Sequence, residues 1–344
     1  MTKIQKLISK GYENAVIFTP QNRFYFTGFE AEDGILLISD GKPYLAMDSR
    51  YIEAAQREVT DAEVLPFNKE FFTLLKKDAV TETSITIDDY ETLKTLFKDA
   101  KLTFSKEFSS VIRELREIKD EKEIECISTA AQIADDAFLK VLPLIKEGVT
   151  ESEIALELEI FMRKSGASKT SFDTIVLCGK NGSMPHGVPG DTPFKKGDLI
   201  TMDFGCVYNG YCSDMTRTVA LGNVDSIAKE VYETVLKAHK AAVPFYKEGV
   251  SCADADKAAR DIITAAGYGE YFGHSLGHGV GIDIHEYPNA SPKSQSVFKK
   301  GNIVTDEPGI YIPEKLGVRI EDMLLVTEKG GKTLSTTQKE LIIL

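Results

Sequence analysis

Two aspartates flank a segment with the pattern of a β-hairpin. Asp203 and Asp214 bracket residues 204–213, in which Asn209-Gly210 is a strong signal for a tight turn. If the hairpin loop has an even number of residues, both aspartates point to the same face, and a four-residue loop would place them directly opposite each other. Like charges in that position repel. The apolar residues around Asp203 argue against two exposed surface acids, so we expect a cation to compensate the charge.

A second pair of acids and a cluster of histidines extend this set. Glu307 and Glu321 lie on strand-like segments on either side of a polar loop. Three of the five histidines, His274, His278 and His285, fall within twelve residues. The glycines around His278 allow close approach of the backbone. We therefore expect these histidines to share a pocket.

Four carboxylates and one imidazole form a hard, oxygen-rich ligand set. Such a set suits Mn²⁺, Co²⁺, Fe²⁺ or Zn²⁺ better than an ion selected by thiolates. Four negative charges balance two divalent cations, and metals about 3.5–4 Å apart can share a water, lower its pKa and hold both reacting oxygens. The chemistry that this set predicts is hydrolysis. His239 lies apart, inside the helical pattern 230–245, and we expect a structural role for it.

An internal repeat positions the two pairs of acids. Residues 146–166 and 247–267 both begin with Lys-Glu-Gly-Val and a hydroxyl residue, continue as a helix and end at a glycine, at an offset of 101 residues. Residues 194–205 recur as 298–309 with six of twelve positions identical, and this match aligns one acid of each pair. Two copies are too few for a solenoid. We expect a duplicated domain with pseudo-two-fold symmetry and a site between its halves.

The first third of the chain alternates strand and helix signals, which is typical of an α/β domain. We expect a helix at 49–58 with Ser49 as its N-cap, a hairpin turn at Asp40-Gly41, and strands at 14–19, 34–39, 42–47, 84–88 and 102–105. A chain of 344 residues fits two domains. A charged run before a long amphipathic helix places the boundary near 120, which gives an α/β domain over 1–120 and an α+β domain over 121–344.

Composition argues against several classes of protein. Asp and Glu number 53 against 41 Lys and Arg, a net charge of −12, whereas binding to nucleic acid depends on basic side chains that neutralise phosphates. No apolar run approaches about 18 residues, the length that spans a membrane. The N-terminus lacks a signal-peptide core, and five cysteines without CxxC spacing fit a reducing compartment. We expect a cytoplasmic protein that binds neither nucleic acid nor membranes.

Five motifs follow one another in the second part of the chain. They are Asp-Phe-Gly at 203–205, Gly-Tyr-Cys-Ser-Asp-Met-Thr-Arg-Thr at 210–218, Gly-His-Ser-Leu-Gly-His-Gly-Val-Gly at 273–281, Glu-Pro-Gly-Ile-Tyr-Ile at 307–312 and Gly-Val-Arg-Ile-Glu-Asp at 317–322. Together they resemble the Xaa-Pro peptidases, aminopeptidase P and prolidase, of the pita-bread metallopeptidase family, and the short bacterial members most of all. The resemblance implies a creatinase-like α/β domain followed by a pita-bread domain.

The resemblance also implies a role for each residue of the site. Two divalent ions would be bridged by two of their five ligands, Asp214 and Glu321, and the full set is Asp203, Asp214, His278, Glu307 and Glu321. Glu307 would also act as the proton shuttle beside a metal-bridging hydroxide. Asp306 departs from the apolar residue of many relatives, and we expect it to point away from the metals.

Three histidines and one arginine complete the implied site. His186 and His285 match histidines that hold the substrate and stabilise the tetrahedral intermediate. His274 matches a histidine that lines the pocket. Arg319 matches an arginine that fixes a ligand carboxylate.

The resulting hypothesis is a metal-dependent peptidase that cleaves the Xaa-Pro bond of dipeptides or of peptide N-termini. We expect Mn²⁺, with Co²⁺, Zn²⁺ and Fe²⁺ as alternatives. The family implies a homodimer in which the front domain of one chain helps to wall its partner's site, and Phe24-Tyr25-Phe26 forms either a contact surface or an internal strand. Two alternatives stay open: an aminopeptidase of the same fold, such as a methionine-aminopeptidase-like enzyme, and a peptide-binding relative without catalysis.

Overall fold

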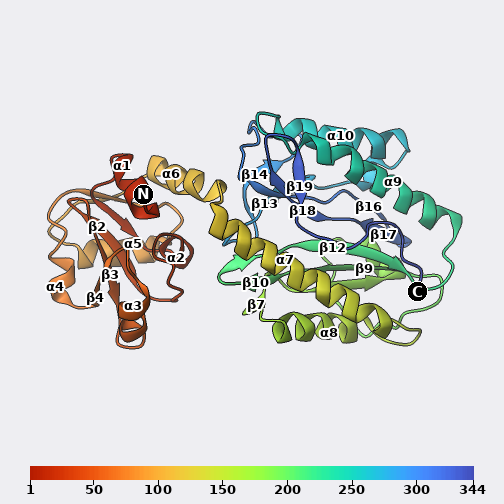
Figure 1. Ribbon diagram of the computed structural model, residues 1–344, viewed down its shortest axis with the longest axis horizontal. Coiled ribbons are helices and arrows are strands. Elements are labelled where there is room, and N and C mark those ends of the chain that lie inside the picture. Colours follow the sequence, from red (N-terminus) through yellow and green to blue (C-terminus); the bar gives the residue numbers. More distant parts are fainter. The chain divides into compact units, whose positions relative to one another are not determined.

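In the computed structural model, which describes residues 1–344, the chain divides into two units between Arg116 and Glu117 (Figure 1). Both units mix helices and strands, as the sequence predicts. No helix in either unit is long and apolar enough to cross a bilayer. The units are described one at a time.

The front unit is built on one six-stranded sheet in the order β4-β3-β2-β1-β5-β6. The pairs β1–β2 and β2–β3 are antiparallel and the others are parallel. The strands are β1 (Ala15–Ile17), β2 (Ile35–Ser39), β3 (Lys42–Met47), β4 (Glu63–Pro66), β5 (Ala79–Thr81) and β6 (Leu102–Phe104). The helices are α1 (Lys3–Ser9), α2 (Pro20–Thr27), α3 (Ile52–Glu58), α4 (Lys69–Phe72), α5 (Ile87–Leu96) and α6 (Lys106–Glu117).

Three local predictions for this unit are wrong. Helix α3 begins at Ile52 with Tyr51 as its N-cap, so Ser49 does not cap it. Residues 84–88 do not form a strand, because Thr86 caps α5 through a capping box with Asp89, and the strand is β5 instead. The aromatic run lies in helix α2, where Tyr25 and Phe26 are only 4% and 2% exposed. These two rings pack inside the unit, so the run is not a strand, and only the half-buried Phe24 is left partly accessible.

The second unit contains the duplication that the sequence predicts. One copy carries α7 (Glu121–Val141) and α8 (Glu151–Lys164), and the other carries α9 (Ser226–Ala242) and α10 (Cys252–Ala265). Helices α8 and α10 both have 14 residues and begin 101 positions apart. Each helix pair packs in its own hydrophobic core, mainly against strands of its own copy, and the core of α9 and α10 also includes Leu199 and Ala220 of the first copy. In Figure 1 the strands lie between the α7–α8 pair and the α9–α10 pair.

The strands of the two copies have matching partners. In the first copy β9 pairs with β12, and in the second β15 pairs with β18, both antiparallel. The first copy comprises β7 (Lys169–Thr170), β8 (Ile175–Cys178), β9 (Leu199–Phe204), β10 (Cys206–Tyr208), β11 (Tyr211–Cys212) and β12 (Met215–Ala220). The second comprises β13 (Gly277–Gly279), β14 (Glu286–Ala290), β15 (Ile303–Asp306), β16 (Gly309–Ile312), β17 (Leu316–Arg319), β18 (Asp322–Val326) and β19 (Gly331–Thr333).

The hairpin of the first copy has a shorter turn than a directly opposed pair of aspartates requires. Asn209 and Gly210 adopt φ angles of 48° and 80°, which a two-residue turn of type I′ needs, so Tyr208 pairs with Tyr211. In this register Asp203 lies opposite Thr216. The loop therefore has an even number of residues, two rather than four. Asp214 stands two positions along from Thr216, so the two aspartates share a face as diagonal neighbours.

Candidate metal centre

Acidic and imidazole groups from both copies converge in the second unit. The ligand atoms of Asp214, His278 and Glu321 all lie within 4.8 Å of one another. His278 Nε2 is 3.5 Å from Asp214 Oδ2 and 3.5 Å from Glu307 Oε1. Asp214 and Glu321 are 6% and 2% exposed. The duplication thus brings together side chains more than 100 positions apart.

The backbone around His278 fixes which nitrogen faces the acids. Nδ1 lies 3.0 Å from the carbonyl oxygen of Gly279, which can only accept, so Nδ1 carries the proton. Nε2 keeps its lone pair, and burial lowers the pKa of His278 to about 4, which holds the ring neutral. The strand can approach this closely because a Cβ on Gly277 would lie 1.9 Å from the carbonyl oxygen of Thr305. Neutral imidazole with a free Nε2 is the form that binds metals.

The carboxylates of the cluster are buried close to one another, which makes their ionised forms unfavourable. Burial raises the pKa of Asp214 well above its ordinary value, and the charges of Asp203 and Glu307 raise it further. Burial and the charge of Asp214 likewise raise the pKa of Glu321. Burial raises the pKa of Glu307 to about 8. A cation between these groups would reverse this tendency and keep the carboxylates ionised.

Arg319 orients one acid from each copy. Its Nη2 donates to Asp203 Oδ2 at 2.5 Å, while Asp203 Oδ1 is buried with no hydrogen-bond partner. Its Nε donates to Thr216 Oγ1 at 2.9 Å, and Thr216 Oγ1 donates to Glu321 Oε2 at 2.6 Å. The buried oxygen of Asp203 without a partner is an unused acceptor, as a metal ligand would be.

The same arginine reaches His274 through Tyr311. Arg319 Nη1 donates to the phenol oxygen of Tyr311 at 2.7 Å, and that phenol lies 3.0 Å from His274 Nε2. His274 Nδ1 lies 2.8 Å from the carbonyl oxygen of Ser275 and therefore carries the proton. Tyr311 must then donate to Nε2. Burial and the charge of Arg319 lower the pKa of His274 to about 4, so this ring is neutral as well.

His186 and His285 are the two exposed histidines near this centre. The ring of His285 lies against that of His278, with 4.3 Å between centroids. His186 lies on the loop after the short 3₁₀ helix η2 (Gly179–Ser183). It is close enough for its charge to add to the effects that lower the pKa of His274, after burial and Arg319. Both rings are thus accessible to a substrate at the edge of the cluster.

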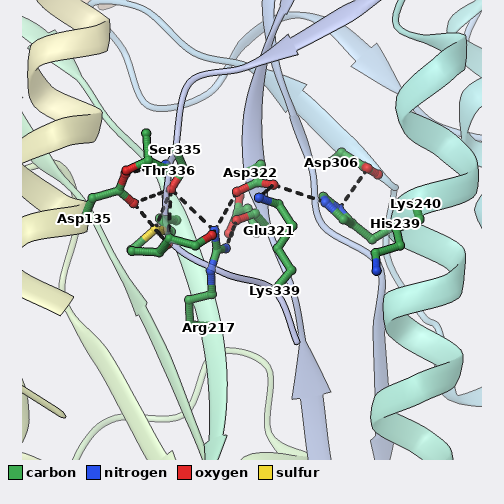
Figure 2. Close-up of polar contacts among 12 residues, drawn as sticks. Asp135, Arg217, His239, Lys240, Asp306, Glu321, Asp322, Ser335, Thr336 and Lys339 are labelled. Carbon is green, nitrogen blue, oxygen red and sulfur yellow. Dashed lines mark hydrogen bonds and ion pairs between the residues drawn. The ribbon is translucent and has the colours of Figure 1, made fainter. Parts of the chain in front are cut away.

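A second polar network lies next to the metal-ligand candidates (Figure 2). His239 Nδ1 is 3.0 Å from Asp306 Oδ2, and His239 Nε2 is 3.1 Å from Asp322 Oδ2. Arg217 Nη2 is 2.7 Å from Asp322 Oδ1, and its Nη1 donates to the carbonyl oxygen of Glu321 at 2.6 Å. Asp306 therefore pairs with His239, away from the acids of the cluster, as expected. His239 therefore has the structural role that was expected, and the structure specifies it as a link between two buried aspartates.

Sequence reasoning missed three residues of this arrangement: Thr216, Arg217 and Tyr311. All three lie inside the motifs that carried the family resemblance. For Thr216 an additional signal was present, because the Asn209-Gly210 turn by itself implies a two-residue loop and hence pairing with Asp203.

The donor set fits a pair of divalent cations. Asp214, His278 and Glu321 cluster together, Glu307 lies beside His278, and Asp203 is bound to Arg319, which also reaches Glu321 through Thr216. Hard divalent ions prefer such oxygen-rich sets. Burial first, and then repulsion between the acids, raises the pKa values of Asp214, Glu307 and Glu321. Arg319 alone neutralises one of four negative charges. The remaining charge is what added cations would compensate.

Comparisons with known proteins agree with this geometry. Residues 125–328 match metallopeptidase family M24, and residues 2–118 match the creatinase/prolidase N-terminal domain. The chain is 40% identical to the Xaa-Pro dipeptidase of Pyrococcus furiosus over 347 residues, which cover 99% of each protein. The solved structure of an Xaa-Pro dipeptidase from Bacillus anthracis has a TM-score of 0.95 at 40% identity and covers 99% of both chains.

An aminopeptidase structure is also similar. The X-Pro aminopeptidase of Thermotoga maritima has a TM-score of 0.91 at 34% identity, over 98% of this chain and 99% of that one. The fold and the family that the sequence motifs resemble are thereby confirmed along the whole chain. This protein belongs to metallopeptidase family M24 and carries a creatinase/prolidase N-terminal domain.

Proposed function

We propose that this enzyme hydrolyses the Xaa-Pro bond of short peptides with two divalent metal ions. The observation that carries the proposal is the convergence of Asp214, His278 and Glu321, with Glu307 beside His278. Relatives named Xaa-Pro dipeptidase that are 40% identical over nearly their full length support the substrate class.

Five side chains would hold the ions: Asp203, Asp214, His278, Glu307 and Glu321. The bridging ligands would be Asp214 and Glu321, which are the most buried of the acids. When bound, the ions supply Lewis-acid polarisation of the scissile carbonyl and a water of lowered pKa. We propose Mn²⁺ as the native ion, with Co²⁺, Zn²⁺ or Fe²⁺ as substitutes, because oxygen ligands dominate the set.

The other polar residues act on the substrate. Glu307, which lies beside His278, would accept a proton from the attacking water and pass it to the leaving prolyl nitrogen, a general acid–base role. His186 and His285 are exposed at the edge of the cluster, where they can hold the substrate and donate hydrogen bonds to the developing oxyanion. His274 would line the pocket, fixed by Tyr311.

A closely related activity is the second candidate. The similarity to the X-Pro aminopeptidase of Thermotoga maritima favours cleavage of the same bond at the N-terminus of longer peptides. The two activities differ in the far end of the pocket, where a dipeptidase must close the site behind the proline carboxylate. A methionine-aminopeptidase-like activity would instead show no requirement for proline.

The remaining parts of the proposal concern the setting of the enzyme. We propose a cytoplasmic homodimer, in keeping with five cysteines that are all unpaired. We also propose that residues 1–120 and 121–344 act as separate domains, the first shaping substrate access and the second carrying the chemistry.

One experiment separates these candidates. Protein stripped of metal is reloaded with Mn²⁺, and hydrolysis of Ala-Pro, Ala-Pro-Ala and Met-Ala-Ala is followed by release of the first residue. A dipeptidase cleaves Ala-Pro far better than Ala-Pro-Ala, and an aminopeptidase cleaves both. Preference for Met-Ala-Ala would assign the methionine-aminopeptidase class. Tight peptide binding without cleavage of any of them would show a non-catalytic relative.

A further inference from the structure

Each of the two exposed histidines lies on a loop whose backbone N–H groups converge on one buried glutamate. We propose that Glu151 and Glu286 are positioning residues that hold the loops of His186 and His285, respectively, in their working geometry. This inference rests on the proposed function, because it assumes that both histidines contact the substrate.

Glu151 closes the loop that carries His186. It is the first residue of α8 and is 1% exposed. Its Oε1 accepts hydrogen bonds from the backbone N–H of Cys178 at 2.8 Å and from Asn181 Nδ2 at 3.0 Å. Its Oε2 accepts from the backbone N–H of Gly190 at 3.1 Å. Because these donors lie on both sides of His186 in the sequence, a single carboxylate ties the two ends of the loop together.

Glu286 does the same for the loop of His285. Its Oε1 accepts from the backbone N–H groups of Ile282 and Asp283 at 3.0 and 3.1 Å. Its Oε2 accepts from Lys119 Nζ at 3.0 Å, and these two side chains are only 8% and 2% exposed. The loop therefore folds back onto the carboxylate of the residue that follows His285. The buried carboxylate of Glu286 is paired with the ammonium of Lys119, and removing one partner would leave the other charge buried and unpaired.

The internal repeat shows that Glu151 is not part of the duplicated framework. The equivalent first residue of α10, 101 positions later, is Cys252. The backbone N–H of Glu151 donates to Thr192 and that of Cys252 donates to Ser296, so both helix starts are fixed in the same way without a carboxylate. In the second copy the exposed histidine, His285, lies on a loop held by a different glutamate, Glu286, so each copy holds its histidine loop by a carboxylate outside the repeated positions.

Glutamine at either position keeps the shape of the side chain but removes one acceptor. In Glu151→Gln the new NH₂ group must face at least one N–H donor, so one end of the loop loses its bond. In Glu286→Gln it faces the ammonium of Lys119. Neither change touches a proposed metal ligand. We expect the histidine of that loop to sample more orientations, which lowers kcat/KM for Ala-Pro at unchanged metal content.

A double-mutant cycle for each loop tests the proposal in the metal-loaded enzyme. We expect Glu151→Gln to lower kcat/KM about fivefold or more in the wild-type background, and less than about twofold in a His186→Ala background. Glu286→Gln and His285→Ala should behave in the same way. If the two losses multiply in the double variant, the glutamate stabilises the fold generally and its positioning role is wrong.

Two further measurements separate the possible failures. His186→Ala with unchanged kcat/KM at full metal content would overturn the proposed role of His186 and, with it, the role of Glu151. If His186→Ala lowers kcat/KM strongly and the losses of kcat/KM multiply fully in the double variant, only the positioning role of Glu151 is overturned. Should Glu151→Gln fail to fold, Asn181→Ala removes one donor of the same carboxylate, and the same non-additivity with His186→Ala is expected. For the loop of His285, the fallback is Glu286→Gln combined with Lys119→Met. The second change removes the ammonium that Glu286→Gln alone would leave without a partner.

A matched control exists in the front unit. Glu82 is buried and accepts from the backbone N–H of Phe18 and of Thr19 and from the side-chain amide of Asn22, a donor set like that of Glu151. It holds no histidine loop. Glu82→Gln should lower the Tm while kcat/KM stays within about twofold. A loss of kcat/KM as large as that of Glu151→Gln would contradict a loop-specific effect.

Discussion

Asp306 and Asp322 lie directly opposite each other on β15 and β18, and both are completely buried. Each precedes or follows a proposed metal ligand in the sequence, Glu307 or Glu321. Two facing carboxylates repel, and the imidazole of His239 contacts both (Figure 2). The imidazole between the two acids thus links the strands that carry the residues next to Glu307 and Glu321.

The stability of the protein should depend on His239 in a pH-dependent manner. Burial alone would lower the pKa of His239, but the charges of Asp306 and Asp322 and their polar contacts with the ring outweigh it and raise the pKa to about 9. A folded-state pKa above the unfolded value of 6.5 means that the stabilisation is complete below about pH 6.5 and is lost as the pH rises through about 9.

We therefore expect His239→Gln to reduce the free energy of unfolding more at pH 6 than at pH 9.5, by up to about 3 kcal/mol. Urea denaturation of the wild type and the variant at both pH values measures the difference. Equal destabilisation at both pH values would mean that His239 is neutral in the folded protein.

Removal of the metals should abolish hydrolysis, and Mn²⁺ or Co²⁺ should restore it. Burial and mutual repulsion raise the pKa of Asp214 and Glu321, and burial raises that of Glu307 to about 8, so the metal-free acids hold protons that a cation must displace. We expect protons to be released when Mn²⁺ binds at pH 7, and affinity to rise with pH. Titration calorimetry in buffers of different ionisation enthalpy measures this release. Unchanged activity in fully chelated protein would contradict a metal-dependent reaction.

Substitution of a metal ligand should lower the metal content, whereas substitution of a substrate-binding residue should not. Asp214→Asn removes a charge from the centre and should weaken metal binding by about tenfold or more. His285→Ala should keep about two metals per chain and lower kcat by about 100-fold, because it removes a donor to the developing oxyanion. Elemental analysis beside steady-state kinetics distinguishes the two. Similar metal loss in both variants would refute the division of roles.

Tyr311 should matter through its hydroxyl group alone. Tyr311→Phe leaves Arg319 Nη1 and His274 Nε2 each without a partner, and an unsatisfied buried polar group costs about 1–3 kcal/mol. We expect kcat/KM for Ala-Pro to fall by about 5- to 100-fold with metal content unchanged. Tyr90→Phe is the control, because the hydroxyl of Tyr90 donates only to a backbone carbonyl of the front unit. A Tyr311→Phe enzyme with full activity would show that the link to His274 is not used.

The sequence predicted the parts of this fold that depend on local patterns. The turn residues at 40–41, the alternation of the front domain and the duplication of the second unit are all visible as short-range signals, and the structure confirms them. The failed strand at 84–88 has a physical reason, because Thr86 and Asp89 form a capping box that favours a helix over the β-propensity of the stretch.

Contacts between distant segments were beyond the sequence. Asp306 stands out in its motif, yet its partner His239 is 67 positions away, on a helix that shows only ordinary amphipathic periodicity. The bond from Thr216 to Glu321 crosses between the two copies. Such pairs depend on how the two copies face each other, and the hydrophobic periodicity of a sequence carries no information on that arrangement. The roles of the five proposed ligands stay predictions until metal is measured.

The two-residue turn at Asn209-Gly210 has a consequence for how this hairpin can vary among related proteins. Surface turns commonly accept insertions and deletions. Here the turn sets the register that places Asp203 opposite Thr216 and Asp214 on the same face. A single inserted or deleted residue would rotate one aspartate to the far side of the ribbon. The turn therefore cannot change in length by one residue, and functional relatives should differ there only by even numbers of residues or by a compensating bulge.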